Sequence, residues 1–172
     1  GGFADHVLVP HPRYLLPLGR LSPAQAAPFA CSGLTAFSAL KRVGDAVLKT
    51  QPIAVIGAGG LGLMCLTLLK ALGGKGAVVA DVDGKKREAA LALGALAAID
   101  AGAPDAVKQL QKAAGGPPAA AIDFVGAESS ARIGIDAIAR GGKYISIGLF
   151  GGEIRLSLPL LPMRAIAIQG AL

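Results

Sequence analysis

Aromatic side chains and cysteines are scarce in this sequence of 172 residues, which has no tryptophan, five Phe, two Tyr and two Cys. Two cysteines cannot build a disulfide framework, which favours a reducing, cytoplasmic environment. Nucleic-acid binding calls for a basic stripe and, for single strands, stacking aromatics. The net charge of +6 is instead spread along the chain, with one basic cluster at residues 85–87. We therefore expect no nucleic-acid partner.

Long hydrophobic runs are also missing. The mean hydropathy is high, at +0.58, but the longest apolar stretch, Leu61 to Leu69, is far shorter than the roughly 20 residues that cross a bilayer. We therefore expect no membrane segment. The first residues lack the Met, the basic segment and the apolar segment of a signal peptide, and we expect them to come from the interior of a longer polypeptide.

Apolar residues are abundant, at 53%, and charged residues make up 16%, which is typical of a folded domain with a core. Residues 1–28 differ from the rest because prolines interrupt them repeatedly, and proline breaks regular structure. Within them, Phe3 to Val9 alternates weakly like a strand, and Ser22-Pro23 has the form of a helix start. We expect an arm and linker over residues 1–28 and one domain over residues 29–172.

From Pro52 onward, short apolar runs alternate with helical segments. The runs predicted as buried strands are residues 53–56, 77–80, 96–99, 120–125, 144–147 and 165–168. The predicted helices are residues 61–72, 85–93, 104–114 and 129–139, after an earlier helix over residues 32–40. This alternation predicts an α/β fold: a doubly wound, six-stranded parallel sheet of the Rossmann type, with helices on both faces.

A glycine-rich motif, G-x-G-x-x-G, follows the first predicted strand and opens the helix behind it. Gly57 would permit the tight turn, Gly59 would let the backbone approach a pyrophosphate, and Gly62 would let the helix pack close to the strand. Gly60 and Leu61 complete the turn, where unpaired N–H groups and the helix dipole attract phosphates. The alternative is a glycine-rich turn without a ligand, which the strand–helix context disfavours.

An acidic residue, Asp81, ends the second predicted strand, 19 residues after the last motif glycine, Gly62. A carboxylate here accepts hydrogen bonds from the adenosine ribose and repels a 2′-phosphate, which favours NAD over NADP. The basic residues 85–87 compete with this interpretation, because they could neutralise a phosphate; they could equally form a solvated first turn. We give the acid more weight, since a 2′-phosphate would lie against it first. Asp83 is predicted to cap the next helix.

Six short segments, taken in order, form a pattern that spans nearly all of the chain. They are GFADH (2–6), ACSGLTAF (30–37), IGAGGLG (56–62), AD (80–81), IDFVG (122–126) and SIGL (146–149). In this order and spacing, the pattern resembles the medium-chain, zinc-dependent alcohol dehydrogenase family. The resemblance implies that the chain is the family's coenzyme-binding domain, preceded by an arm from its catalytic domain.

The resemblance also implies roles for single residues. Cys31 aligns with a ligand of the catalytic zinc, Thr35 with the residue beside the nicotinamide, and Lys86 with a residue that contacts the adenosine ribose. The alternative for Cys31 is a small buried core residue. The residues implied to line the adenine and nicotinamide sides of the coenzyme cleft are Leu61, Phe124, Ile147 and Gly148.

The activity that the resemblance implies is that of an NAD-dependent alcohol dehydrogenase, in which zinc holds an alcohol and the nicotinamide takes a hydride, giving an aldehyde or ketone. In the family, the other zinc ligands, the proton relay and most of the substrate pocket belong to a preceding catalytic domain. We therefore expect this chain alone to be inactive and to hold no zinc. Two alternatives stay open. One is the coenzyme domain of a zinc-free quinone or enoyl reductase, against which Cys31 argues, and the other is a non-catalytic nucleotide-binding module.

The last predicted strand, residues 165–168, bears on assembly. It is apolar, and an unpaired edge strand invites pairing with another chain. Members of the family that this chain resembles pair this strand between two subunits, so the resemblance implies a homodimer or a higher assembly with two-fold contacts. The alternative is a monomer in which the crossover at residues 156–161 covers the edge.

Overall fold

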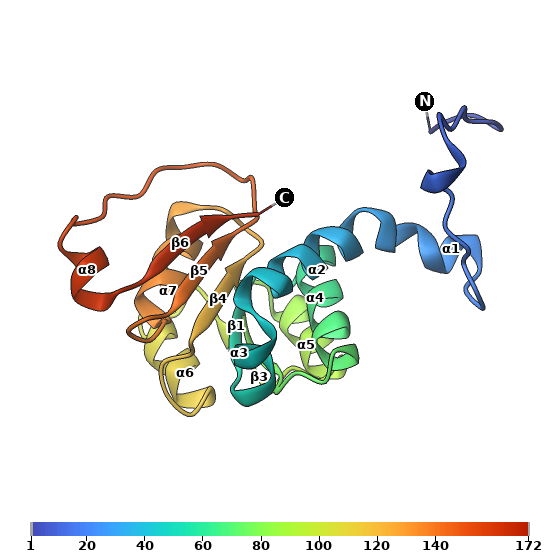
Figure 1. The fold of residues 1–172 in the computed structure, drawn as a ribbon. Coiled ribbons are helices and arrows are strands. Elements are labelled where there is room, and N and C mark those ends of the chain that lie inside the picture. Colours follow the sequence, from blue (N-terminus) through green and yellow to red (C-terminus); the bar gives the residue numbers. More distant parts are fainter. Residues whose placement is uncertain (1, 172) are drawn as a thin grey trace.

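The computed structural model of the chain describes residues 2–171 (Figure 1). Gly1 and Leu172, which end the two predicted domains, lie outside the described residues. The strands are β1 (Ile53–Ile56), β2 (Ala77–Asp81), β3 (Ala97–Asp100), β4 (Ala120–Asp123), β5 (Lys143–Ser146) and β6 (Ala167–Gly170). The helices are α1 (Pro23–Ala26), α2 (Ser32–Val43), α3 (Asp45–Thr50), α4 (Gly60–Ala71), α5 (Gly84–Ala92), α6 (Ala106–Ala113), α7 (Glu128–Ala137) and α8 (Leu160–Arg164), with 3-10 turns η1 (Pro12–Tyr14) and η2 (Ala27–Ala30).

The six strands form one parallel sheet in the order β3-β2-β1-β4-β5-β6. The strand order reverses between β1 and β4, and ligands of such sheets bind beyond the carboxyl ends of the strands at this reversal. The predicted α/β fold with a doubly wound parallel sheet is confirmed.

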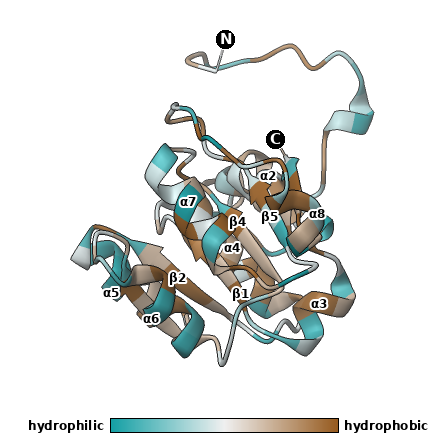
Figure 2. Cartoon of the chain, turned by 90° about the vertical axis from the view of Figure 1, so that its left-hand side faces the viewer, coloured by the Kyte–Doolittle hydropathy of each residue, from teal (hydrophilic) through white to brown (hydrophobic). Residues whose placement is uncertain are grey.

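The core has two layers, one on each face of the sheet, because successive strand residues point to opposite faces. In β1, Ile53 and Val55 join a buried cluster with residues of α2 and α4. Ala54 and Ile56 join a second cluster with residues of α6 and α7. Figure 1 shows α2, α4 and α5 on one side of the sheet and α6, α7 and α8 on the other. Figure 2 shows hydrophobic strands between helices with hydrophilic outer faces.

Helix α2 connects the start of the domain to the sheet. It buries Ala36, Ala39, Leu40 and Val43, a spacing that places them on one face. At its carboxyl end, the Nζ of Lys143 donates hydrogen bonds to the carbonyl oxygens of Arg42 (3.0 Å) and Val43 (3.2 Å). A cation here satisfies carbonyl groups that the helix leaves unpaired, so the first residue of β5 fixes the position of the end of α2.

The arm lies away from the body of the molecule (Figure 1), and none of residues 2–31 is buried. The predicted strand over Phe3 to Val9 is wrong: these residues form no strand, since a strand needs a neighbour for its backbone hydrogen bonds and the sheet is distant. The predicted helix start is confirmed. Ser22 caps α1 in a capping box with Gln25.

The sixth strand begins later than predicted. β6 spans Ala167–Gly170, whereas Ile166 is buried in the core beside α7. All four β6 residues are exposed. The crossover packs Ile154 and Leu156 against the same core cluster, so it covers a face of the sheet and leaves the β6 edge open. The alternative of a covered edge is therefore wrong.

Candidate functional site

A cavity of about 570 Å³, large enough for a nucleotide, lies at the carboxyl ends of β1, β4 and β5. We call it the first cavity. Helix α2 supplies one wall, and the glycine turn before α4 supplies another. The structure thereby brings together most of the residues that the sequence singled out. The lining residues are Cys31, Ser32, Thr35, Gly59, Gly60, Leu61, Gly62, Phe124, Ile147, Gly148 and Leu149.

The glycines of the motif divide into two kinds. Gly57 has φ +92° and Gly62 is buried, and a Cβ on Gly62 would overlap the carbonyl oxygen of Gly57. These two glycines are required by the fold itself. By contrast, a Cβ on Gly59 or on Gly60 would meet nothing within 4 Å. The space in front of these two is open to a ligand.

The N-terminus of α4 fits an anionic group. The first N–H groups of a helix have no partner within the helix, and no side chain caps this one, because the N-cap residue is Gly59. The twelve-residue helix also places the positive end of its dipole at this turn. Open space and unpaired donors together make a cradle that fits the pyrophosphate of a dinucleotide.

Asp81 lies beside this turn at the end of β2 and is 8% exposed. Its Oδ2 accepts a hydrogen bond from the Ala58 N–H (2.7 Å), and its Oδ1 accepts one from the Asp83 N–H (2.9 Å). The carboxylate is therefore fixed against the glycine motif. Each of its oxygens can accept a further hydrogen bond, so the side chain can still receive a ligand hydroxyl.

The basic residues after Asp81 have different surroundings. Arg87 does not form a solvated turn: its Nη1 donates to the carbonyl oxygens of Asp81 (2.8 Å) and Val82 (2.9 Å) and lies 3.6 Å from Asp100. Lys86 and its neighbour Lys85 are exposed. The predicted cap is confirmed, because the carboxylate of Asp83 accepts a hydrogen bond from the Lys85 N–H (2.8 Å).

A second cavity, of about 290 Å³, lies on the other side of β4. Phe124, Ile147 and Gly148, which the resemblance placed along both sides of the coenzyme cleft, all line the first cavity and not the second. The second is lined by Ile56, Ala80, Val82, Ala101, Val125, Ala127, Ser129, Ser130, Ile133 and Phe150. None of these residues was predicted from the sequence to belong to the site. A signal existed in the predicted strand over residues 120–125, where the consecutive side chains of Phe124 and Val125 would point to opposite sides. In the structure β4 ends at Asp123, and residues 124 and 125 form a bend.

Asp123, at the end of β4, holds the turn between the two cavities and was also missed. It is fully buried, and its Oδ1 accepts hydrogen bonds from the N–H groups of Val125 (2.8 Å) and Gly126 (3.0 Å). Its Oδ2 accepts from the hydroxyls of Ser130 (2.8 Å) and Tyr144 (2.7 Å). Burial and this hydrogen bond raise the pKa of Tyr144 far above its usual value. The carboxylate is fully partnered, so it orders the turn and is not free to act as a base.

Two glycines, Gly126 and Gly148, face each other where the loops after β4 and β5 meet. A Cβ on Gly126 would overlap the carbonyl group of Gly148, and a Cβ on Gly148 would overlap the backbone of Val125. The loops after β4 and β5 therefore touch through bare backbone. This contact places Phe124 and Ile147 side by side on the first cavity.

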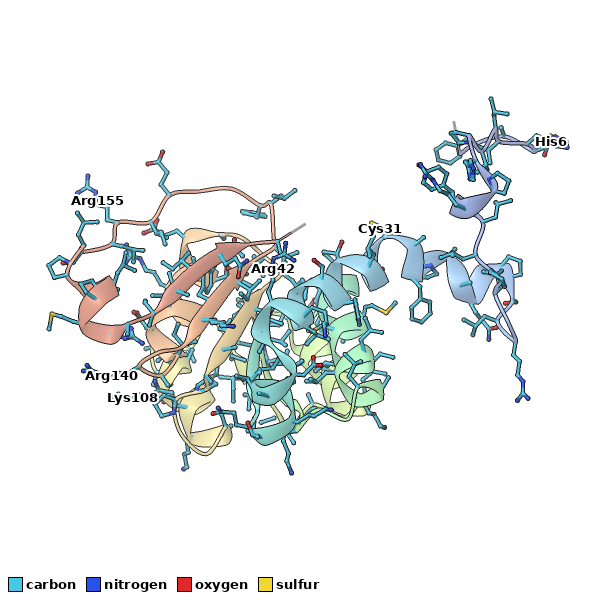
Figure 3. All side chains as sticks on the ribbon, in the orientation of Figure 1. His6, Cys31, Arg42, Lys108, Arg140 and Arg155 are labelled. Atoms are coloured by element: carbon cyan, nitrogen blue, oxygen red, sulfur yellow. The ribbon has the colours of Figure 1, made fainter. Side chains whose placement is uncertain are left out.

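Cys31 precedes α2, at the end that joins the arm (Figure 3). It is an exposed free thiol, so the alternative of a buried core cysteine is wrong. The Thr35 N–H donates to the Cys31 carbonyl oxygen (3.0 Å), and both residues line the first cavity. Within residues 2–171, no three His, Cys, Asp or Glu side chains gather where they could hold a metal. The described residues thus offer Cys31 as a single candidate ligand for zinc and do not by themselves fit the ion.

The other cysteine, Cys65, is buried in the core, and burial raises the pKa of its thiol to about 12.

Within the described part of the chain, no helix has the length and apolar character needed to cross a membrane.

Comparison with known proteins agrees with the fold. The family model described as "Zinc-binding dehydrogenase" matches residues 60–172. An NAD-dependent alcohol dehydrogenase of Sulfurisphaera tokodaii is 37% identical over all of this chain and 50% of its own length. The D-arabinose dehydrogenase structure from Sulfolobus solfataricus has a TM-score of 0.84 at 29% identity, covering 95% of this chain and 51% of that one.

The alcohol dehydrogenase structure from Aeropyrum pernix has a TM-score of 0.80 at 30% identity, over 91% of this chain and 46% of that one. The chain spans about half the length of the relatives that it matches. The family match covers most of the chain, and the similarity to the Sulfurisphaera protein covers all of it. The chain therefore belongs to the zinc-binding dehydrogenase family and corresponds to the half of these proteins that has the Rossmann fold.

Proposed function

We propose that this chain is the NAD(H)-binding part of an NAD-dependent alcohol dehydrogenase, with residues 29–172 as the coenzyme domain and residues 1–28 as an arm to the rest of the enzyme. One observation carries the proposal. Cys31 and Thr35, at the start of α2, line the same cavity as the glycine turn before α4. The substrate side and the coenzyme side of a dehydrogenase would thus meet in one space.

The bound coenzyme supplies a hydride acceptor at its nicotinamide ring, and the residues of this chain bind and orient it. The N–H groups at Gly59 and Gly60 bind the pyrophosphate, and Asp81 accepts hydrogen bonds from the adenosine ribose. Lys86, exposed on the first turn of α5, contacts the same ribose. Thr35 lies beside the nicotinamide and is the residue of this chain closest to the reaction.

The walls of the two cavities have complementary roles. Leu61, Phe124 and Ile147, with the backbone of Gly148, form an apolar wall that keeps water from the nicotinamide in the first cavity. The adenine ring lies in the second cavity, which Val82 and Val125 line from the ends of β2 and β4. The coenzyme thereby spans the strand-order reversal at β1 and β4.

Cys31 is a zinc ligand of the full-length enzyme, with partners from outside the described residues, and the substrate is a small alcohol or the corresponding aldehyde or ketone. A lone thiolate lacks the chelating partners of a zinc site, so this chain alone binds no stoichiometric zinc. The exposure of Cys31 on the cavity favours the zinc enzyme over a zinc-free reductase.

The proposal extends to assembly and location. The open edge of β6 supports a homodimer formed by strand pairing. Two cysteines without a disulfide between them support a cytoplasmic setting.

Coenzyme choice tests the proposal. We expect the chain to bind NADH at least about tenfold more tightly than NADPH, a difference of about 1.4 kcal/mol, because Asp81 repels a 2′-phosphate. Asp81→Asn removes the charge at similar size and should bring the two affinities together. Calorimetric titration with both coenzymes measures this.

Asp136→Asn is the matched control, because Asp136 is an exposed carboxylate on α7 and its loss changes the net charge equally. It should keep the preference of the wild type. Equal or tighter binding of NADPH by the wild type would overturn the assignment of NAD.

A further inference from the structure

The loop after β5 presents an aromatic ring to water. Phe150 is 83% exposed, in a chain with only five Phe and two Tyr, and it lines the second cavity. Leaving a large apolar side chain in water forgoes the free energy of its burial. A ring placed at the mouth of a cavity is therefore a candidate for contact with a ligand.

The backbone holds this ring in place. The Phe150 N–H donates to the carbonyl oxygen of Val125 (3.1 Å), and the Gly151 N–H donates to that of Gly126 (3.0 Å). The loop after β5 is thus fastened to the turn after β4, which the buried carboxylate of Asp123 orders in turn. Phe150 therefore belongs to the ordered rim of the second cavity.

The chemistry of the second cavity suits a flat, uncharged ring. Among the described residues, no ionisable side chain lines it, and the hydroxyl of Ser130 is already bonded to Asp123. Val82 on the rim is 71% exposed and directly follows Asp81. A ribose bound to the Asp81 carboxylate would direct its attached base toward Val82 and into this cavity.

We propose that Phe150 stacks on the adenine ring of the coenzyme and positions it in the second cavity, with Val82 and Val125 as the other walls. Base–aromatic stacking is strong and tolerates different bases. The inference rests on the proposed NAD(H) binding. It makes the β5 loop part of the adenine site, in addition to its place on the first cavity through Leu149.

A tryptophan probe tests the contact directly. Phe150→Trp gives a chain with one tryptophan, because the sequence has none. We expect 5′-AMP to quench its fluorescence and the quenching to saturate, whereas nicotinamide mononucleotide should leave it unchanged. Leu158→Trp is the matched control: Leu158 is 78% exposed on the crossover and lines neither cavity, so 5′-AMP should not quench it.

Affinity gives a second measurement. Phe150→Ala should weaken binding of ADP-ribose about tenfold, in line with the loss of one stacked aromatic, while Phe150→Tyr and Leu158→Ala should bind as the wild type does. Circular dichroism checks that each variant is folded. If the wild type binds neither NADH nor ADP-ribose, the proposed function fails. If it binds both, and Phe150→Ala binds ADP-ribose equally well, the assignment of Phe150 alone is overturned.

Discussion

At the scale of single residues, the glycine motif separates what the fold requires from what a ligand requires. A Cβ on Gly62 would overlap the backbone of Gly57, so Gly62→Ala should destabilise the domain by about 3 kcal/mol or more, at the upper end of overpacking costs. Gly59 has φ −76° and open space around it, a conformation that alanine adopts readily.

Gly59→Ala is therefore expected to leave the melting temperature nearly unchanged and to weaken NADH binding at least about tenfold, because its methyl group occupies the space of a phosphate. Thermal unfolding and calorimetric titration of both variants measure the contrast. A Gly59→Ala variant that binds NADH like the wild type would show that the turn does not hold the pyrophosphate.

The two cysteine thiols of the chain differ in their exposure to solvent. Cys31 is exposed, whereas Cys65 is buried and its pKa is raised to about 12. The thiolate is the reactive form, so a thiol reagent at pH 8 should modify one thiol per native chain quickly. The second should react only after unfolding. Titration with a chromogenic disulfide, with Cys31→Ser as control, tests this; two fast thiols in the wild type would contradict it.

At the scale of elements, the junction of α8 and β6 contains a strained residue. Ala165 has φ +49°, the left-handed region, which costs an L residue about 1–2 kcal/mol. Ala165→Gly should therefore raise the stability by about 0.5–1 kcal/mol, once the greater freedom of glycine in the unfolded chain is included.

Ala167→Gly, in the exposed strand two residues later, is the control for Ala165→Gly. It should lower stability by about 0.5–1 kcal/mol, because glycine weakens a strand. Denaturant unfolding compares both variants with the wild type. A loss of stability in Ala165→Gly would mean that the left-handed conformation is not strained.

Elements with a strong local pattern could be predicted from the sequence. The four-residue run at β1 is buried on both faces, and such runs are recognisable without knowledge of their neighbours. Helix α3 could not be predicted, because its six residues bury only Leu48 and the helix depends on packing against the end of α2. The predicted start of β6, at residue 165, was too early, because Ile166 is apolar like its neighbours but belongs to the core beside α7.

The site, too, contains residues that could be predicted from the sequence and residues that could not. The glycine turn and Asp81 follow a pattern in which each residue type has a local reason, so they were predictable. Phe150 and the partners of Asp123 were not, since the contact of Asp123 with Tyr144 joins residues 21 positions apart. Only the pairing of β4 with β5 brings them together.

At the scale of the whole molecule, the β6 edge tests the proposed homodimer. The N–H groups of Ala167 and Ala171 bond to carbonyl oxygens of Gly142 and Ser146 on the β5 side. Backbone N–H groups alternate in direction along a strand, so the N–H of Ile168 points away from β5. Ile168→Pro removes that donor and leaves the bonds to β5 in place.

We expect Ile168→Pro to sediment as a monomer at concentrations where the wild type is a dimer. Ile168→Ala, which keeps the N–H and shortens the side chain, should remain a dimer. An Ile168→Pro variant that assembles like the wild type would place the contact between subunits elsewhere.

The paired glycines in the loops after β4 and β5 also constrain how this protein can diverge. Neither Gly126 nor Gly148 can gain a side chain without displacing the other's loop, and a change at one cannot be compensated by a change at the other, since neither has a side chain to shorten. Neutral drift is therefore blocked at both positions. Heritable variation in ligand preference must instead accumulate in the flanking side chains, Phe124 and Val125 on one loop and Leu149 and Phe150 on the other.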